Sequence, residues 1–155
     1  DFDDQKMMEV FASGDLAVER IQVCAWLKPE EDPGFEPITD RQMAQFLNGL
    51  INERRGRREG AQPVPEETLS NNMVLMKLRI ALNLQSDDVQ ALLLETGLSF
   101  SKHELSALFR KPGHKHYRHC EDQLLRNFLK GLQQRLRKEV EAPAAQDVTH
   151  DLWKR

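Results

Sequence analysis

The sequence of 155 residues has few of the residue types that define the non-globular classes of protein. Its 2 cysteines, Cys24 and Cys120, are too few for a disulfide scaffold. With 7 prolines and 8 glycines, its composition is neither collagen-like nor that of a disordered chain. No apolar run approaches the roughly 18 residues of a membrane-spanning helix, and no signal peptide is visible. We therefore expect a cytoplasmic globular protein with no membrane partner.

The sequence also has none of the common catalytic or metal-binding motifs. It contains no glycine-rich phosphate loop, serine elbow, Cys-x-x-Cys or His-Glu-x-x-His pattern. Two adjacent acidic pairs, Asp3–Asp4 and Asp87–Asp88, could suggest acid–base chemistry. Neighbouring side chains on a helix point about 100° apart, however, so the charge preference of a helix start explains both pairs. We expect no catalytic residues, no metal and no cofactor.

Charge is distributed unevenly along the chain. Residues 1–47 contain four basic and eleven acidic residues, whereas residues 99–140 contain ten basic and four acidic residues. Four of the 5 histidines also lie in the second stretch. The two halves could attract each other within one molecule, the basic half could face a polyanion, or both could simply be solvated surfaces.

One segment of the sequence occurs twice. Phe46–Leu50 (FLNGL) recurs as Phe128–Leu132 (FLKGL), and we call the separation between these two segments the repeat spacing. Two further pairs have the same spacing: Asp40 with Asp122, and Phe35 with Tyr117. The pairs Asp3–Asp4 and Asp87–Asp88 lie slightly further apart, which would require a two-residue difference in loop length. Such duplication indicates a tandem repeat.

Apolar residues recur at helical spacing throughout, and no strand pattern is visible, so we predict an all-α fold. The fold is a tandem repeat of a four-helix unit: first repeat 1–55, linker 56–69, second repeat 70–140 and a poorly ordered tail 141–155. The first repeat lacks a counterpart of the opening helix predicted from Ser70 to about Leu84. Its uncovered apolar surface should attract a partner chain, a foreign helix or a second copy of the protein.

Helix boundaries follow from capping residues. Capping boxes are predicted at Thr39–Gln42 and Ser101–Glu104, a cap at Ser70, and a helix start at Ser86. The last helix is predicted from about Asp122 to Lys138.

Four residues in the repeated segment are predicted to be structural. Gly49 and Gly131 stand inside helices, where glycine costs roughly 1 kcal/mol relative to alanine. Close approach of another helix explains them better than a substrate site does. Phe46 and Phe128 are the matching core anchors.

The stretch from Lys111 to Arg126 is the candidate binding surface. The candidate residues combine positive charge with a ring that could stack on a base: Lys111, His114, Lys115, Tyr117, Arg118 and Arg126. The alternative is that Tyr117 packs inward, as Phe35 would, while the charges are solvated.

Two chemical interpretations of the same stretch are weaker. His114, His116, His119 and Cys120 lie within seven residues, but a tetrahedral zinc site favours ligands from two separated stretches. An enzyme with a site between the repeats would use His114, Cys120 and Asp122, which requires these side chains to converge on one pocket.

The combined motifs resemble one family. They are Asn71–Asn72, Lys77–Ala81, Asp87–Asp88, His114–Lys115, Tyr117–Arg118, Cys120, Asp122–Gln123, Leu125–Arg126 and Phe128–Leu132. This set resembles domain of unknown function 1456, the YehS-like bacterial proteins. The resemblance implies two tandem helical copies and a bacterial cytosolic setting, with no activity. His116 and His119 depart from the Asn and Glu more usual in that family, which further disfavours a histidine metal site.

From these features we expect a binding module, regulatory or adaptor in role, whose partner is an unknown protein. Nucleic acid, RNA in particular, is the alternative partner of the same surface. An enzyme is the second alternative.

Overall fold

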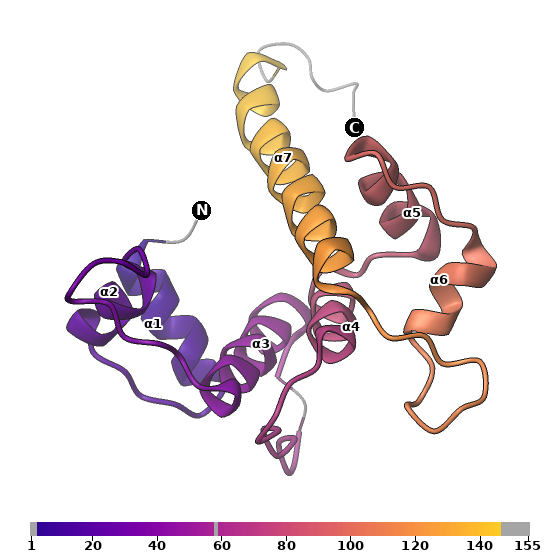
Figure 1. Cartoon of the computed structure of the whole chain (residues 1–155). Coiled ribbons are helices and arrows are strands. Elements are labelled where there is room, and N and C mark those ends of the chain that lie inside the picture. Colours follow the sequence, from indigo (N-terminus) through magenta and orange to yellow (C-terminus); the bar gives the residue numbers. More distant parts are fainter. Residues whose placement is uncertain (1–2, 58, 147–155) are drawn as a thin grey trace. The chain divides into compact units, whose positions relative to one another are not determined.

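A computed structural model describes residues 3–57 and 59–146, with side chains as far as Arg137. All regular secondary structure in these ranges is helical (Figure 1), which confirms the predicted all-α class. The helices are α1 (Asp4–Ser13), α2 (Arg20–Leu27), α3 (Asp40–Arg55), α4 (Asn71–Leu82), α5 (Ser86–Glu95), α6 (Lys102–Leu108) and α7 (Asp122–Gln146). None of the helices is long and apolar enough, over the described residues, to cross a bilayer.

The predicted caps and the predicted helix start are confirmed. Thr39 and Ser101 each form a complete capping box, and the Ser70 side chain accepts a hydrogen bond from the Met73 amide. Helix α5 begins at Ser86, as predicted, and its N-cap is Gln85. The Gln85 amide donates to Asp88 at 2.8 Å, so one of the two carboxylates takes part in the cap.

The last helix is longer than predicted. It was expected to end near Lys138, but α7 continues to Gln146 and includes the first part of the segment 141–155 that we expected to be poorly ordered. The remainder of that tail lies outside the described residues.

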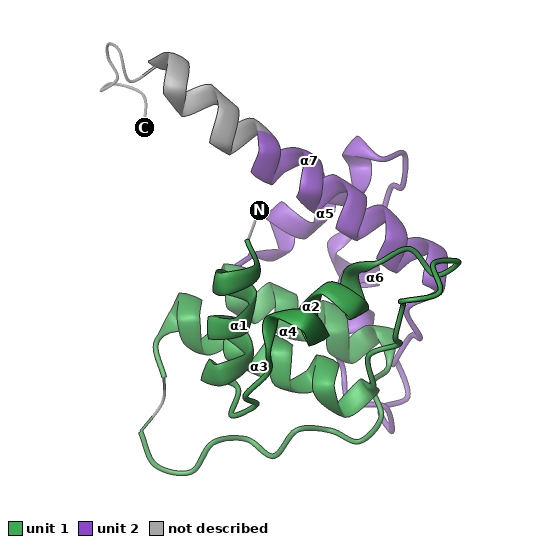
Figure 2. Cartoon of the chain, turned by 90° about the vertical axis from the view of Figure 1, so that its left-hand side faces the viewer, with its two compact units in different colours: residues 1–83 green, residues 84–155 purple. Residues whose placement is uncertain are grey.

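The chain divides into two compact units (Figure 2). Unit 1, Asp1–Asn83, contains α1 to α4, and unit 2, Leu84–Arg155, contains α5 to α7. The sequence grouped α4 with the helices that follow it. In the structure α4 packs against α3 within unit 1 instead.

In unit 1, α3 packs against both α1 and α4. Val10 and Phe11 of α1, together with Leu47 of α3 and Leu75 of α4, are almost completely buried. The Phe11 ring lies 4.9 Å from the Phe46 ring, measured between centroids. Burial of this apolar surface is the main stabilising contribution to the unit.

In unit 2, α5 packs against α6 and α7. Phe128 of α7 is completely buried, together with Leu92 and Leu93 of α5 and Leu105 of α6. Phe46, the counterpart of Phe128 in unit 1, is only partly buried. The two aromatic anchors therefore both line cores but differ in how completely they are enclosed.

Both mid-helix glycines lie against the backbone of another helix. A Cβ added to Gly49 would be 1.9 Å from the carbonyl oxygen of Val10 in α1. A Cβ added to Gly131 would be 2.6 Å from the carbonyl oxygen of Leu92 in α5. Neither position has room for a side chain.

The three helices of unit 2 follow the first three helices of unit 1 at the repeat spacing. Helix α1 begins at Asp4 and α5 at Ser86, and α3 begins at Asp40 and α7 at Asp122. Residues Asp15 and Gly97, which have the same spacing, both have positive φ just after a helix. The two acidic doublets do not have this spacing, whereas the N-cap residues Asp3 and Gln85 do.

Candidate functional site

The candidate binding loop, residues 109–121, joins α6 to α7 and is held by backbone hydrogen bonds. The amide of His114 donates to the carbonyl oxygen of Lys111 at 2.9 Å, and the amide of Tyr117 donates to that of His114 at 2.9 Å. The amide of Arg118 donates to the carbonyl oxygen of Ala107 in α6 at 3.0 Å. The loop therefore has a defined turn geometry and a fixed attachment to α6.

The loop between α2 and α3 has the same three bonds one repeat spacing earlier. They are Asp32 to Pro29 at 2.9 Å, Phe35 to Asp32 at 3.0 Å and Glu36 to Ala25 at 3.1 Å. A side chain closes each turn in the same place. Asp32 Oδ1 accepts from the Gly34 amide at 2.7 Å, and His114 Nδ1 accepts from the His116 amide at 3.0 Å. An Asx-type turn is thus reproduced with an imidazole nitrogen as the acceptor.

The two loops differ in the charge they present. In unit 1 the loop carries Glu30, Glu31 and Glu36, all exposed. In unit 2 it carries Lys111, Lys115 and Arg118, also exposed. The same backbone therefore supports an acidic loop in one unit and a basic loop in the other.

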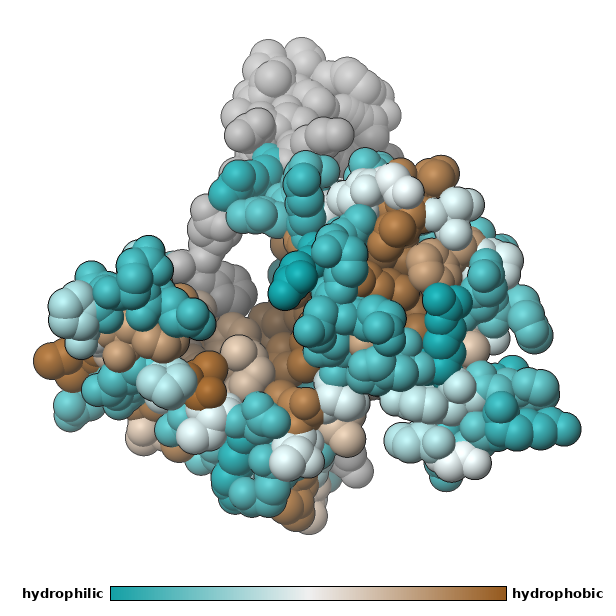
Figure 3. Space-filling model, in the orientation of Figure 1, coloured by the Kyte–Doolittle hydropathy of each residue, from teal (hydrophilic) through white to brown (hydrophobic). Residues whose placement is uncertain are grey.

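We call the six predicted binding residues of unit 2 the basic surface: Lys111, His114, Lys115, Tyr117, Arg118 and Arg126. Five of them are exposed, and Tyr117 is partly buried. Phe35, the counterpart of Tyr117, is partly buried too. The space-filling view shows hydrophilic side chains over this loop and an apolar patch over α5 (Figure 3).

Arg118 is held by contacts within unit 2. Its guanidinium lies 5.1 Å from the centre of the Phe100 ring, and its Nη1 lies 4.0 Å from Glu104 Oε2. Cation–π contacts and exposed ion pairs each contribute at most about 1 kcal/mol. These neighbours orient Arg118 at the edge of the exposed loop.

The histidines of the loop do not build a metal centre with Cys120. The His114 and His116 rings are near each other, 5.5 Å between centroids, but both are exposed while Cys120 is completely buried. Among the residues the structure describes, no three His, Cys, Asp or Glu side chains gather to hold a metal ion.

Cys120 is also poorly suited to act as a nucleophile. Burial, reinforced by the charges of Asp122 and Glu121, raises the pKa of its thiol to about 11. The thiolate is the nucleophilic form, so this thiol is protonated and unreactive at neutral pH.

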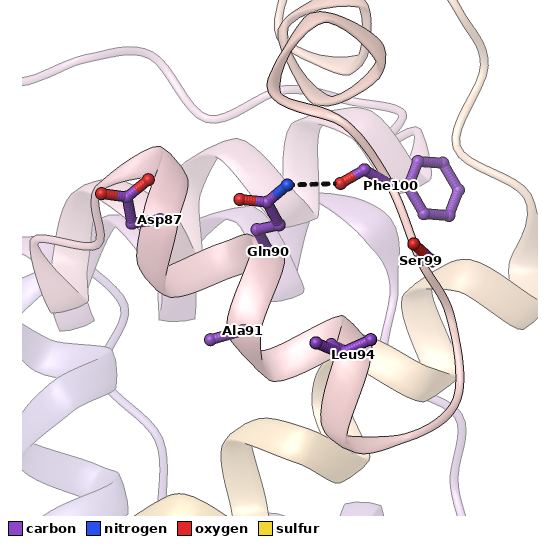
Figure 4. Close-up of a pocket in the computed structure, with 6 residues that line it drawn as sticks. All are labelled: Asp87, Gln90, Ala91, Leu94, Ser99 and Phe100. Carbon is purple, nitrogen blue, oxygen red and sulfur yellow. Dashed lines mark hydrogen bonds between the residues drawn. The ribbon is translucent and has the colours of Figure 1, made fainter.

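A shallow pocket of about 230 Å³ lies elsewhere on unit 2, between α5 and the segment that follows it (Figure 4). Its lining residues are Asp87, Gln90, Ala91, Leu94, Ser99 and Phe100. The Gln90 amide nitrogen donates to the carbonyl oxygen of Phe100 at 2.7 Å, and Asp87 pairs with Lys102 at 2.7 Å. These polar groups already have partners within the protein. His114, Cys120 and Asp122 are not among the lining residues.

Sequence reasoning missed a polar contact between α3 and α4. Lys77 Nζ donates to Asn48 Oδ1 at 2.6 Å and lies 3.2 Å from Glu66 Oε1. Asn48 is buried. The available signal was the polar Asn48 beside Gly49, between the apolar residues Leu47 and Leu50.

Comparison with known proteins gives the family. The model of the family described as "Protein of unknown function (DUF1456)" matches residues 1–56 and 71–138. The chain belongs to this family. The match confirms the resemblance inferred from the motifs and covers α1 to α3, α4 to α6 and α7 as far as residue 138.

This DUF1456 chain is similar to "Uncharacterized protein YehS" of Escherichia coli (strain K12). The two are 42% identical over 127 residues, which is 81% of each chain. No match is found among the solved structures. The family assignment therefore brings a relationship but no activity to the residues described above.

Proposed function

We propose that this DUF1456 protein is a non-catalytic module of the bacterial cytoplasm that binds a partner macromolecule as an adaptor or regulator. The partner is a protein with an acidic surface, and it contacts the basic surface of unit 2. We further propose that α1–α3 and α5–α7 are tandem copies of one helical unit, with α4 as the opening helix of the second copy.

One observation carries the proposal: the two equivalent loops have the same backbone and opposite charge. The acidic loop of unit 1 makes the same three backbone hydrogen bonds without any lysine or arginine among the residues that form them. Folding of the loop therefore does not require Lys111 or Lys115. Exposed residues that folding does not require are candidates for recognition.

The electrostatics also favour an acidic partner. A cluster of exposed cations attracts a negatively charged surface over roughly a Debye length, about 8 Å at physiological salt. It raises the association rate more than it raises the affinity. The buried, protonated Cys120 and the exposed His114 lend no support to the alternative enzyme.

The test compares two double variants. The loop variant combines Lys111→Glu with Lys115→Glu, and the control combines Glu30→Gln with Glu31→Gln in the equivalent loop of unit 1. Each protein is immobilised and exposed to nuclease-treated Escherichia coli lysate, and the retained proteins are quantified by mass spectrometry. We expect acidic proteins that the wild type and the control retain and the loop variant loses. Identical sets on all three proteins, or no retained protein, would contradict the proposal.

RNA is the second candidate, because the exposed His114 and His116 rings lie close together among the cations. Rings of this kind can stack on unpaired bases. The test is binding of a short fluorescent single-stranded RNA at several salt concentrations. Three phosphate contacts predict a slope of about −2 in log K against log salt. Binding that is insensitive to salt, or absent, would exclude RNA as the partner.

A further inference from the structure

Helix α7 carries exposed leucines, one of which has a buried counterpart on α3. Leu47 of α3, a helix that packs against α4, is 3% exposed, whereas Leu129, one repeat spacing later on α7, is 41% exposed. Leu136, two turns further along α7, is 40% exposed. Helical geometry places the partly buried Leu125 and the exposed Leu129 and Leu136 within about 40° of one another around the axis, and we call these three residues the α7 strip. The strip lies beside the face that packs on α5.

The residues next to this strip differ in charge between the two helices. Ala44 and Asn48 of α3 are buried, and their counterparts on α7 are the exposed Arg126 and Lys130. On α3, Asn48 accepts a hydrogen bond from Lys77 of α4. If a partner helix packs on α7 in the register in which α4 packs on α3, its residue equivalent to Lys77 lies next to Lys130.

We propose that the α7 strip is a docking site for an amphipathic helix of a partner protein, and that this helix carries an acidic residue opposite Lys130. The α3–α4 pair supplies the geometry, because a helix of 12 residues already packs on the equivalent face. The charges supply the selectivity, since a basic residue opposite Lys130 would be repelled and a carboxylate attracted.

The same charges disfavour a second copy of the chain as the occupant. Two α7 strips packed face to face would bring the Arg126 and Lys130 side chains of both copies together. Like charges in such an interface are destabilising. The site is distinct from the loop of residues 109–121, since it depends on Leu129 and Lys130, although Arg126 belongs both to the basic surface and to the charges beside the strip.

The probes are two peptides with blocked ends, both based on residues 70–84. One has the natural sequence, and the other, which we call the acidic peptide, carries Lys77→Glu. Binding of each fluorescently labelled peptide to the whole chain is measured by anisotropy up to millimolar protein. We expect the acidic peptide to bind about fivefold more tightly, because one exposed charge pair changes from repulsive to attractive. Equal affinities, or no binding of either peptide, would overturn the proposal.

Variants of the chain locate the site. Leu129→Asp should abolish binding of the acidic peptide, whereas the matched variant Leu94→Asp, at an exposed leucine of α5, should not. Lys130→Asn recreates the α3 arrangement and should shift the preference toward the natural peptide. The variant with Lys111→Glu and Lys115→Glu should bind the acidic peptide as the wild type does, so failure of the loop proposal remains distinguishable. Self-association that Leu129→Asp removes would identify a second copy as the occupant and overturn the proposal.

Discussion

Replacing Gly49 with alanine tests the close contact between α1 and α3. The added Cβ would lie 1.9 Å from the carbonyl oxygen of Val10 and 2.9 Å from both the carbonyl carbon of Val10 and the amide nitrogen of Gly14. All three atoms belong to backbone, so no flexible side chain can move aside. Ordinary van der Waals contact with the nearest atom begins at 3.4 Å, so α1 as a whole must retreat from α3 to restore it.

The expected magnitude is a balance of two effects. Alanine gains about 1 kcal/mol over glycine in helix propensity. Overpacking of a core typically costs about 1–3 kcal/mol, and the backbone clash here places the cost at the upper end of that range. We therefore expect Gly49→Ala to reduce the free energy of unfolding of unit 1 by about 2 kcal/mol.

Urea denaturation of the whole chain, followed by circular dichroism and by tryptophan fluorescence, to which Trp26 contributes, measures this change. Trp26 packs on Phe11 of α1, with ring centroids 5.1 Å apart. Gly131→Ala, whose Cβ would be 2.6 Å from a backbone oxygen, should have a smaller effect, and Gly113→Ala, with nothing within 4 Å, should have almost none. A neutral or stabilised Gly49→Ala protein would refute the close-packing argument.

Three further predictions concern single side chains. In the native protein at mildly alkaline pH, a thiol reagent should modify the partly exposed Cys24 and leave Cys120, whose pKa is raised to about 11, unmodified until the protein unfolds. Equal rates of modification of the two cysteines, measured by mass spectrometry, would contradict this prediction. Hydrogen bonds from the backbone amide and the hydroxyl of Ser101 lower the pKa of Glu104 in the folded protein. The capping interaction of Glu104 therefore stabilises α6 fully at pH values above the ordinary glutamate pKa. This stabilisation is lost as the pH falls through the lowered pKa of the folded protein. Glu104→Gln should therefore weaken the acid dependence of amide exchange in α6, and an unchanged profile would count against the cap. Lys77→Met should cost about 1–3 kcal/mol in urea unfolding by leaving the buried Asn48 without its donor, whereas no loss of stability would argue against the polar contact.

Features that depend on neighbouring residues could be predicted from the sequence. Thr39 and Ser101 were assigned as capping boxes because the three-residue spacing to Gln42 and Glu104 is itself the interaction. Gly49 suggested close helix contact because no local preference explains a glycine inside a helix.

Features that depend on tertiary packing could not be predicted. The apolar stripe of α4 fits α3 as well as it fits its sequence neighbours, and nothing local shows that α4 packs on α3. Matching by residue identity paired Asp3 with Asp87, whereas Asp3 and Gln85 are the two residues that share the role of N-cap. Capping needs a suitable acceptor and geometry, which different residue types provide.

The candidate site was predictable in charge but not in contacts. The basic composition of residues 111–126 was evident in the sequence. The contacts of Arg118 with Phe100 and Glu104 were not, because they join residues from separate segments. The uncovered apolar surface was expected on the first copy, but α4 packs against α3 there, and on α7 it is Leu129, the counterpart of the buried Leu47, that is exposed instead.

A loop exchange measures most directly whether equivalent backbones carry opposite recognition chemistry. In the exchange variant, residues 111–119 are replaced by the sequence of residues 29–37. The urea unfolding of this variant and the lysate proteins that it retains are compared with those of the wild type. The expected result is a free energy of unfolding within about 1 kcal/mol of the wild type and loss of the acidic partner proteins. A chain that fails to fold, or one that folds and retains the same partners, would contradict it.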